Sequence, residues 1–149
     1  MSRTDLTNYL IHFTKPVSIG NETIDGFHIL LKILYNECLI GGTGYIKGDY
    51  RCICFSEAPI EAIKESINRK FQNKYSPFGI RVSKEWLFNE GGRPVIYQPD
   101  SEFELLPDSL KWRHVRFDLG DNPVDFTWER EWRIRCDELS FSPDGYQLK

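Results

Sequence analysis

The chain has 149 residues, of which 40% are hydrophobic and 14% aromatic, and its formal net charge is −3. This length is typical of one domain, and the aromatic content argues against a disordered chain. The acidic balance argues against a protein that holds nucleic acid by a broadly basic surface. We therefore expect one compact domain over residues 1–149.

The N-terminal segment 1–13 lacks the long apolar run and small-residue cleavage site of a secretory signal. No later segment reaches the roughly 18 consecutive apolar residues that a membrane-spanning helix needs. These features predict a cytoplasmic protein without membrane contact. In that compartment the four cysteines are expected to be reduced and buried as small hydrophobic side chains.

The first third of the chain predicts a strand followed by a helix. Residues 9–13 are expected to form a buried opening strand. Asp25 is a good N-cap for a helix that ends at Gly41 and Gly42. The apolar positions of this helix are expected to share one face: Phe27, Leu30, Leu31 and Leu34.

The middle of the chain repeats this alternation of strand and helix. Residues 51–55 predict a short strand, and Pro59 fits the first turn of a helix. Residues 78–82 predict a half-buried strand, after which Ser83 can cap a short helix that ends at Gly91. The apolar positions of the helix after Pro59 have helical spacing: Ile60, Ile63 and Ile67.

The last third of the chain predicts mainly strands. Residues 94–98 are expected to form one strand, and residues 101–110 one or two helical turns. Residues 112–119 and 127–135 predict two further strands, which the turn-forming segment 120–123 can join as a hairpin.

These elements favour an α+β fold over a doubly wound parallel sheet. Helices are concentrated in the middle of the chain, and the final strands have an antiparallel pattern, which predicts antiparallel or mixed sheets. The sequence contains no Gly-rich phosphate loop of the dinucleotide-binding or Walker type.

The segment 127–135 carries the highest density of charged and aromatic residues. Along a strand, period two places Glu129 and Glu131 on one face with Arg133 and Arg135. One interpretation is a solvent-exposed sheet face. The other is a carboxylate kept ionised by neighbouring arginines, which can stabilise a developing positive charge.

Two earlier segments also carry candidate site residues. His12 and Thr14 are expected to leave one face of the opening strand near its end, although a lone histidine is often structural. In segment 52–59, Ser56 and the backbone amides at the start of a helix could meet an anionic ligand. Because no second ligand pair accompanies Cys52 and Cys54, we expect no metal site.

Two basic segments, 111–116 and 130–135, interleave cations with tryptophan. This pattern is compatible with phosphate contacts and base stacking, and equally with a solvated strand face.

Together these segments resemble prokaryotic proteins related to ADP-ribosyltransferases, namely the AbiGi-type abortive-infection group and, more distantly, DarT-type enzymes. The resemblance implies a split α+β fold of the ADP-ribosyltransferase type, with NAD as a substrate bound in a cleft and no metal. The matching residues are spread over most of the chain: His12–Thr14, Cys54–Pro59, Phe78–Trp86, Gly91–Tyr97 and Trp128–Arg133.

The resemblance also implies roles for individual residues. Glu131 would be the catalytic carboxylate at the nicotinamide ribose, with Glu129 as the alternative for that role. From the strand face that it is expected to share with Glu131, Glu129 could also help to activate the acceptor. The cofactor-binding residues would be His12 and Thr14 at the adenosine-side ribose, and Phe55, Tyr45 or Tyr50 at the nicotinamide. Ser56, through its place at the start of a helix, is the further candidate for contact with the cofactor.

Three functions follow from these observations. The first is ADP-ribosyl transfer from NAD to nucleic acid or protein, as in a toxin or phage-defence effector. The second is a non-catalytic module on the same fold that binds a nucleotide or a partner, as in an antitoxin or a sensor. The third is a nucleic-acid-binding domain. The sequence does not indicate an oligomeric state.

Overall fold

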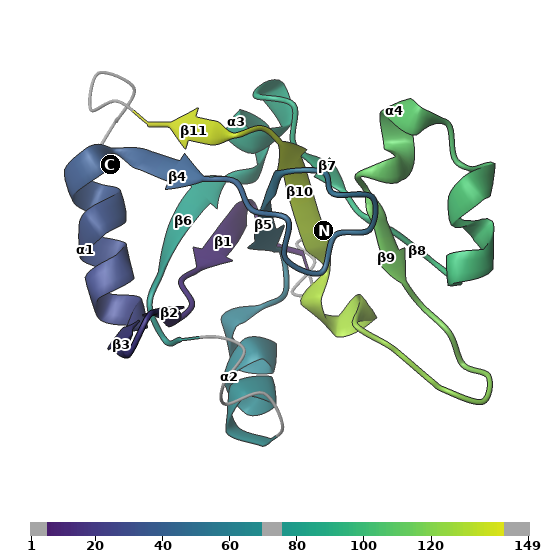
Figure 1. Ribbon diagram of the computed structural model, residues 1–149, viewed down its shortest axis with the longest axis horizontal. Coiled ribbons are helices and arrows are strands. Elements are labelled where there is room, and N and C mark those ends of the chain that lie inside the picture. The colour runs from purple at the N-terminus through teal and green to yellow at the C-terminus, as the bar shows by residue number, and fades with distance from the viewer. Residues whose placement is uncertain (1–5, 70–75, 142–149) are drawn as a thin grey trace.

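A central five-stranded sheet organises the fold in a computed structural model, which describes residues 6–69 and 76–141, with the side chains of α2 described to residue 65 (Figure 1). The strand order is β6-β1-β5-β10-β7, and every neighbouring pair is antiparallel. The strands are β1 (Tyr9–Phe13), β5 (Cys52–Ser56), β6 (Gly79–Ser83), β7 (Arg93–Pro94) and β10 (Glu131–Arg135).

Alternation along β5 and β10 separates a core face from a polar face. Trp132 is paired with Phe55, and Ile134 with Ile53. These four side chains are buried together in the main hydrophobic core. The remaining cross-strand pairs therefore share the opposite face: Glu131 with Ser56, Arg133 with Cys54, and Arg135 with Cys52.

Three two-stranded sheets surround this centre. The antiparallel pairs are β2 (Val17–Ile19) with β3 (Glu22–Ile24), and β4 (Cys38–Ile40) with β11 (Glu138–Ser140). The pair of β8 (Ile96–Gln98) with β9 (His114–Arg116) is parallel. The structure therefore confirms a compact α+β fold with mixed sheets.

The helices begin where side-chain caps were predicted. The Asp25 carboxylate accepts from the His28 backbone N–H at 2.9 Å at the start of α1 (Gly26–Asn36). Ser83 caps α3 (Lys84–Asn89) by accepting from the Trp86 N–H at 3.2 Å. Each cap satisfies one of the first backbone donors of its helix.

The remaining helical elements are short except for α2 (Ile60–Arg69), which follows Pro59 as expected. In that helix Ile60 is exposed and Ile63 is buried, whereas the side chain of Ile67 lies outside the described residues. The other segments are η1 (Asp100–Leu105), α4 (Asp108–Lys111) and η2 (Thr127–Glu129). Among the described helices, none combines the length and hydrophobicity needed to cross a membrane.

Helix α1 differs from the prediction at its end and on its apolar face. It stops at Asn36, because Glu37 adopts a left-handed conformation with φ of 50° and the chain then forms β4. Three of its four expected apolar positions are exposed: Phe27, Leu31 and Leu34. Ile33, on another side of the helix, packs against the core instead.

The predicted hairpin of 112–119 with 127–135 is wrong. β9 pairs with β8, and β10 pairs with β5 and β7. Between Pro94 and Ile96 the chain passes from the central sheet to the β8–β9 pair, and Val95 donates to the Glu131 carbonyl at 3.0 Å on the way. Figure 1 shows β8, β9 and α4 grouped at the end of the molecule opposite α1.

Candidate functional site

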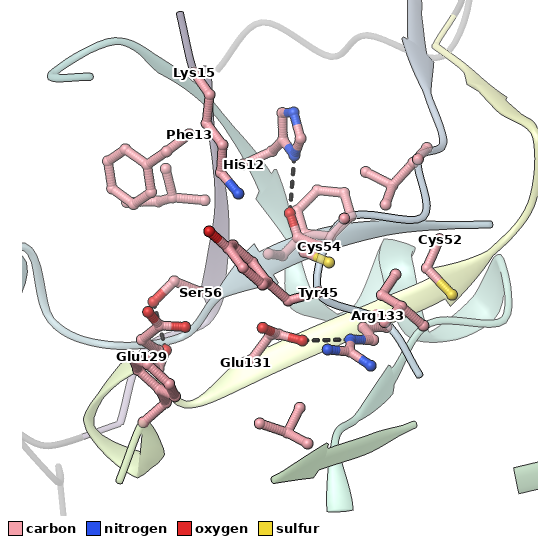
Figure 2. Close-up of a pocket in the computed structure, with 18 of the residues that line it drawn as sticks. His12, Phe13, Lys15, Tyr45, Cys52, Cys54, Ser56, Glu129, Glu131 and Arg133 are labelled. Carbon is pink, nitrogen blue, oxygen red and sulfur yellow. Dashed lines mark hydrogen bonds and ion pairs between the residues drawn. The ribbon is translucent and has the colours of Figure 1, made fainter. Parts of the chain in front are cut away.

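Strands β1, β5 and β10 line a cleft of about 1350 Å³, together with β9 and residues 42–47 between β4 and β5 (Figure 2). Seven of the eight predicted site residues line this cleft: His12, Thr14, Tyr45, Phe55, Ser56, Glu129 and Glu131. The fold thus gathers side chains from segments that are more than 100 residues apart in the sequence.

Tyr50 does not share this location. Its ring lies 4.8 Å from the Arg135 guanidinium and packs against a small cluster formed by Ile46, Cys52 and Trp112. Tyr45, by contrast, lines the cleft and is 92% exposed. Of the two candidate tyrosines, only Tyr45 offers a ring to a ligand in this cleft.

Glu131 and Arg133 form an ion pair at the start of β10 that is largely shielded from solvent. The Nε–H of Arg133 donates to the Glu131 carboxylate, and the two side chains are 15% and 4% exposed. The Nη1 group of Arg133 donates to the carbonyls of Trp112 at 3.1 Å and His114 at 2.9 Å. The interpretation of this segment as a solvent-exposed charged face is therefore wrong for these two residues.

The charge of Arg133 is stabilised in spite of its burial. Burial alone would lower its pKa, but the nearby Glu131 carboxylate raises the pKa of Arg133 above its usual value. The guanidinium therefore stays charged, and it holds the carboxylate of Glu131 in one orientation within the cleft.

Glu129 reaches the cleft from a turn and not from the predicted strand. Residues Thr127–Glu129 form a 3-10 turn, and Arg130 has a φ of 44°, which interrupts the extended backbone. The placement of Glu129 and Glu131 on one continuous strand face is therefore wrong. Glu129 is nevertheless only 4% exposed and lines the cleft, and Ser56 Oγ donates to its carbonyl at 2.5 Å.

His12 presents a neutral imidazole at the β1 side of the cleft. Its ring nitrogen Nδ1 lies 2.8 Å from the Cys54 carbonyl, and because a carbonyl only accepts, Nδ1 carries the proton. Burial lowers the pKa of His12 below its ordinary value of 6.5, against a smaller opposing effect of this hydrogen bond. The Nε2 atom therefore keeps a lone pair that can accept a hydrogen bond.

Thr14 and Phe55 line the cleft mainly as parts of its wall. Thr14 is 1% exposed, and its hydroxyl bonds to the Gly26 carbonyl at 2.8 Å and to Ser76 Oγ at 2.7 Å. Phe55 is 2% exposed, and its ring meets the edge of His12 at 5.7 Å between centroids. Thr14 thus joins the end of β1 to α1 and to the segment before β6, and Phe55 packs β5 against β1.

Sequence reasoning missed Tyr97, which lies behind Glu131. Its hydroxyl accepts from the Glu131 backbone N–H at 3.0 Å, and burial raises the pKa of Tyr97 to about 12. It also missed Lys47 and Asp100 at the β9 end of the cleft, where His114 and Arg116 of the basic segment 111–116 also lie. No local motif marks Lys47 and Asp100, because they reach this end of the cleft only through the tertiary fold.

The two basic segments do not form a stacking surface for bases. Trp112 and Trp132 are buried, and their indole N–H groups donate to the Ser109 carbonyl at 2.8 Å and the Glu57 carboxylate at 2.9 Å. Lys111 is paired with Glu104 at 3.0 Å. The prediction of base stacking on these tryptophans is therefore wrong.

The cysteines are free thiols. Burial raises the pKa of Cys52 to about 11 and that of Cys54 to about 12, so both thiols stay protonated at neutral pH. Within residues 6–69 and 76–141, no group of three or more His, Cys, Asp or Glu side chains is arranged to hold a metal ion.

No protein-family model, curated protein or solved structure matches this chain. The basis for a functional assignment is therefore the geometry of the cleft. It combines a carboxylate oriented by an arginine, a neutral histidine acceptor and an exposed tyrosine ring. This set can bind a sugar hydroxyl, stack on a planar ring and stabilise a positive charge that develops nearby.

Proposed function

We propose that the protein is an NAD-dependent ADP-ribosyltransferase with a fold of that type, and that Glu131 is its central carboxylate. The observation that carries the proposal is that Glu131, oriented by Arg133, shares one cleft with neutral His12. The residues that the sequence resemblance assigns to the two ends of NAD thus face the same cavity.

The spacing of the strands suits an extended ligand. Strand β5 separates β1 from β10, and Ile11 and Glu131 both pair with Ser56, so the backbones of β1 and β10 lie two strand spacings apart here, or about 10 Å. His12 is the residue after Ile11 on β1. In the proposed complex, His12 Nε2 accepts from a hydroxyl of the adenosine-side ribose, and Glu131 lies beside the nicotinamide ribose. The exposed ring of Tyr45 is available to stack on nicotinamide, and Figure 2 shows it between His12 and Glu131 in this view.

The proposed reaction breaks the bond between the ribose C1′ and the nicotinamide nitrogen, and the bonding electrons leave with nicotinamide. Positive charge develops on the ribose, where the fixed carboxylate of Glu131 stabilises it. A nucleophilic atom of the acceptor then bonds to C1′ and gives up its proton. Glu129, which lines the same cleft, is the proposed proton acceptor.

The test is nicotinamide release from NAD by the wild type and by Glu131→Gln, with and without DNA, RNA or cell lysate. We expect the variant to lose about 100-fold or more of the rate, the usual effect of removing one charge-stabilising group. Glu138→Gln, at an exposed position of β11, is the matched control. Thermal unfolding of both variants controls for the loss of Arg133's partner.

The outcomes separate the candidate functions. Equal turnover by Glu131→Gln and the wild type would overturn the role of Glu131. Saturable NAD binding without release under any condition would favour the non-catalytic binding module instead. Dependence of release on one additive would identify the class of acceptor that a toxin or phage-defence effector of this kind would modify.

A further inference from the structure

The cleft is larger than one small ligand requires. Its volume of about 1350 Å³ exceeds the roughly 300–1,000 Å³ of ordinary small-molecule sites. One end of the cleft lies at β1, with His12, and the other end lies at β9. Strand β10 lies between the two ends, since β5 joins it to β1 and Arg133 of β10 donates to the His114 carbonyl of β9. We call the second end the β9 subsite, formed by Lys47, Asp100, His114, Arg116 and Arg133.

Two cations of the β9 subsite share one carboxylate. Lys47 Nζ lies 3.6 Å from one oxygen of Asp100, and Arg116 Nε lies 3.9 Å from the other. These distances are longer than the roughly 2.7–2.9 Å of a charge-assisted hydrogen bond, and the three side chains are 41–48% exposed. A single carboxylate therefore leaves this pair of cations with an excess positive charge that solvent or a ligand can reach.

Arg133 contributes a donor group from the floor of the same region. Its Nε–H and Nη1 group are used by Glu131, Trp112 and His114, but within the described residues Nη2 has no acceptor. Among these residues, Gln98 Oε1 is the one buried side-chain polar atom that lacks both solvent contact and a partner. Nη2 of Arg133 is therefore reached by solvent, although the side chain is only 4% exposed.

His114 is close enough to Asp100, Lys47 and Arg133 to interact with their charges. It is 3% exposed, and its Nε2 lies 3.4 Å from the Pro99 carbonyl. Burial lowers its pKa, Asp100 acts in the opposite direction, and Lys47 and Arg133 lower it further, so the imidazole is neutral. The charges of the subsite thus come from three cations and from Asp100 and Glu131, which leaves one positive charge in excess.

We propose that the β9 subsite binds a phosphate group of the acceptor substrate, through Lys47, Arg116 and the Nη2 group of Arg133. A phosphate oxygen suits this set because an ammonium and a guanidinium flank the same carboxylate of Asp100, and the guanidinium of Arg133 lines the same cleft. The identification of the ligand as the acceptor rests on the proposed function. The binding of phosphate at this end of the cleft does not depend on the proposed function.

The direct test is calorimetric titration of the whole chain with ribose 5-phosphate, with ribose as the uncharged control and a dinucleotide as the phosphodiester probe. We expect phosphate-dependent binding that Lys47→Ala/Arg116→Ala weakens at least about tenfold. Lys32→Ala/Lys64→Ala, on the exposed surfaces of α1 and α2, removes the same charge elsewhere and should leave the affinity unchanged. Asp100→Asn should tighten binding, because it removes the carboxylate that competes for both cations.

The relative affinities of the two phosphate probes show whether a monoester or a diester is preferred, and binding of either supports the subsite. The β9 subsite would be overturned by equal affinities for ribose and ribose 5-phosphate. It would also be overturned if Lys47→Ala/Arg116→Ala and Lys32→Ala/Lys64→Ala lost the same affinity for ribose 5-phosphate.

The calorimetric titration is repeated in the presence of a carbocyclic NAD analogue, which resists cleavage. This experiment shows whether the β9 subsite and the NAD site are distinct. Retained binding of ribose 5-phosphate by protein saturated with the analogue supports a second subsite. Complete displacement by the analogue would assign Lys47 and Arg116 to the pyrophosphate of NAD and overturn the proposal. If the protein binds ribose 5-phosphate at these residues but does not bind the analogue, the subsite stands and the proposed function fails.

Discussion

Arg133 donates to the carboxylate of Glu131, two residues before it on the same face of β10. The same guanidinium donates to the carbonyls of Trp112 and His114 in the segment that leads into and begins β9. It therefore connects the proposed catalytic carboxylate to the β8–β9 pair, which has no ladder of backbone hydrogen bonds to β10. One side chain thus serves both the orientation of Glu131 and the attachment of the β9 end of the cleft.

Removal of this guanidinium should destabilise the fold strongly. We expect Arg133→Met to lower the free energy of unfolding by about 3–5 kcal/mol, because it removes the charge that compensates the largely shielded Glu131 carboxylate and the donor to the Trp112 and His114 carbonyls. Urea unfolding measures the change. Arg135→Met on the same strand is the control and should cost less than about 1 kcal/mol, because Arg135 is exposed. Equal unfolding midpoints for the two variants would contradict this account.

Tyr45 should matter for ligand binding and not for stability. Because its side chain is 92% exposed, Tyr45→Ala should leave the unfolding midpoint nearly unchanged. The loss of a stacking ring should weaken NAD binding by about 1 kcal/mol, or roughly fivefold. Tyr35→Ala is a matched control, since Tyr35 is 89% exposed on α1 and does not line the cleft. Fluorescence titration with NAD that gives equal affinities for both variants would remove Tyr45 from the site.

His12 should make stability fall in mild acid. The pKa of His12 is lower in the folded protein than its ordinary value of 6.5, chiefly because of burial. As the pH falls below about 6.5, the unfolded state takes up the proton first, so stability present above this pH is lost progressively toward the lower folded pKa. Burial acts in the same direction on His114.

The measurement is the free energy of unfolding of the wild type and His12→Gln at several pH values from 7.5 to 5. The slope with pH should be smaller in His12→Gln, whose amide can still donate to the Cys54 carbonyl. His28→Gln removes an exposed imidazole on α1 and controls for the substitution itself. An unchanged slope in His12→Gln would show that His12 does not contribute to the pH dependence.

Local interactions explain what could be predicted from the sequence. The caps formed by Asp25 and Ser83 each involve a backbone N–H three residues away, and the bounds of β1 follow from a short apolar run. Such features depend on neighbours within one helical turn or one strand, so the residue order alone determines them. The α+β class follows from the succession of these elements.

Tertiary contacts decided the form of the candidate site. Arg130 turns the chain into a left-handed conformation, so Glu129 enters the cleft from a turn that periodicity could not reveal. The burial of Arg133 depends on carbonyls about 20 residues earlier, and the Glu131 N–H bonds to Tyr97, 34 residues away. Sequence determined which side chains are available to the site. The pairing of distant strands determined which of them meet, because burial and hydrogen-bond partners are set by neighbours in space.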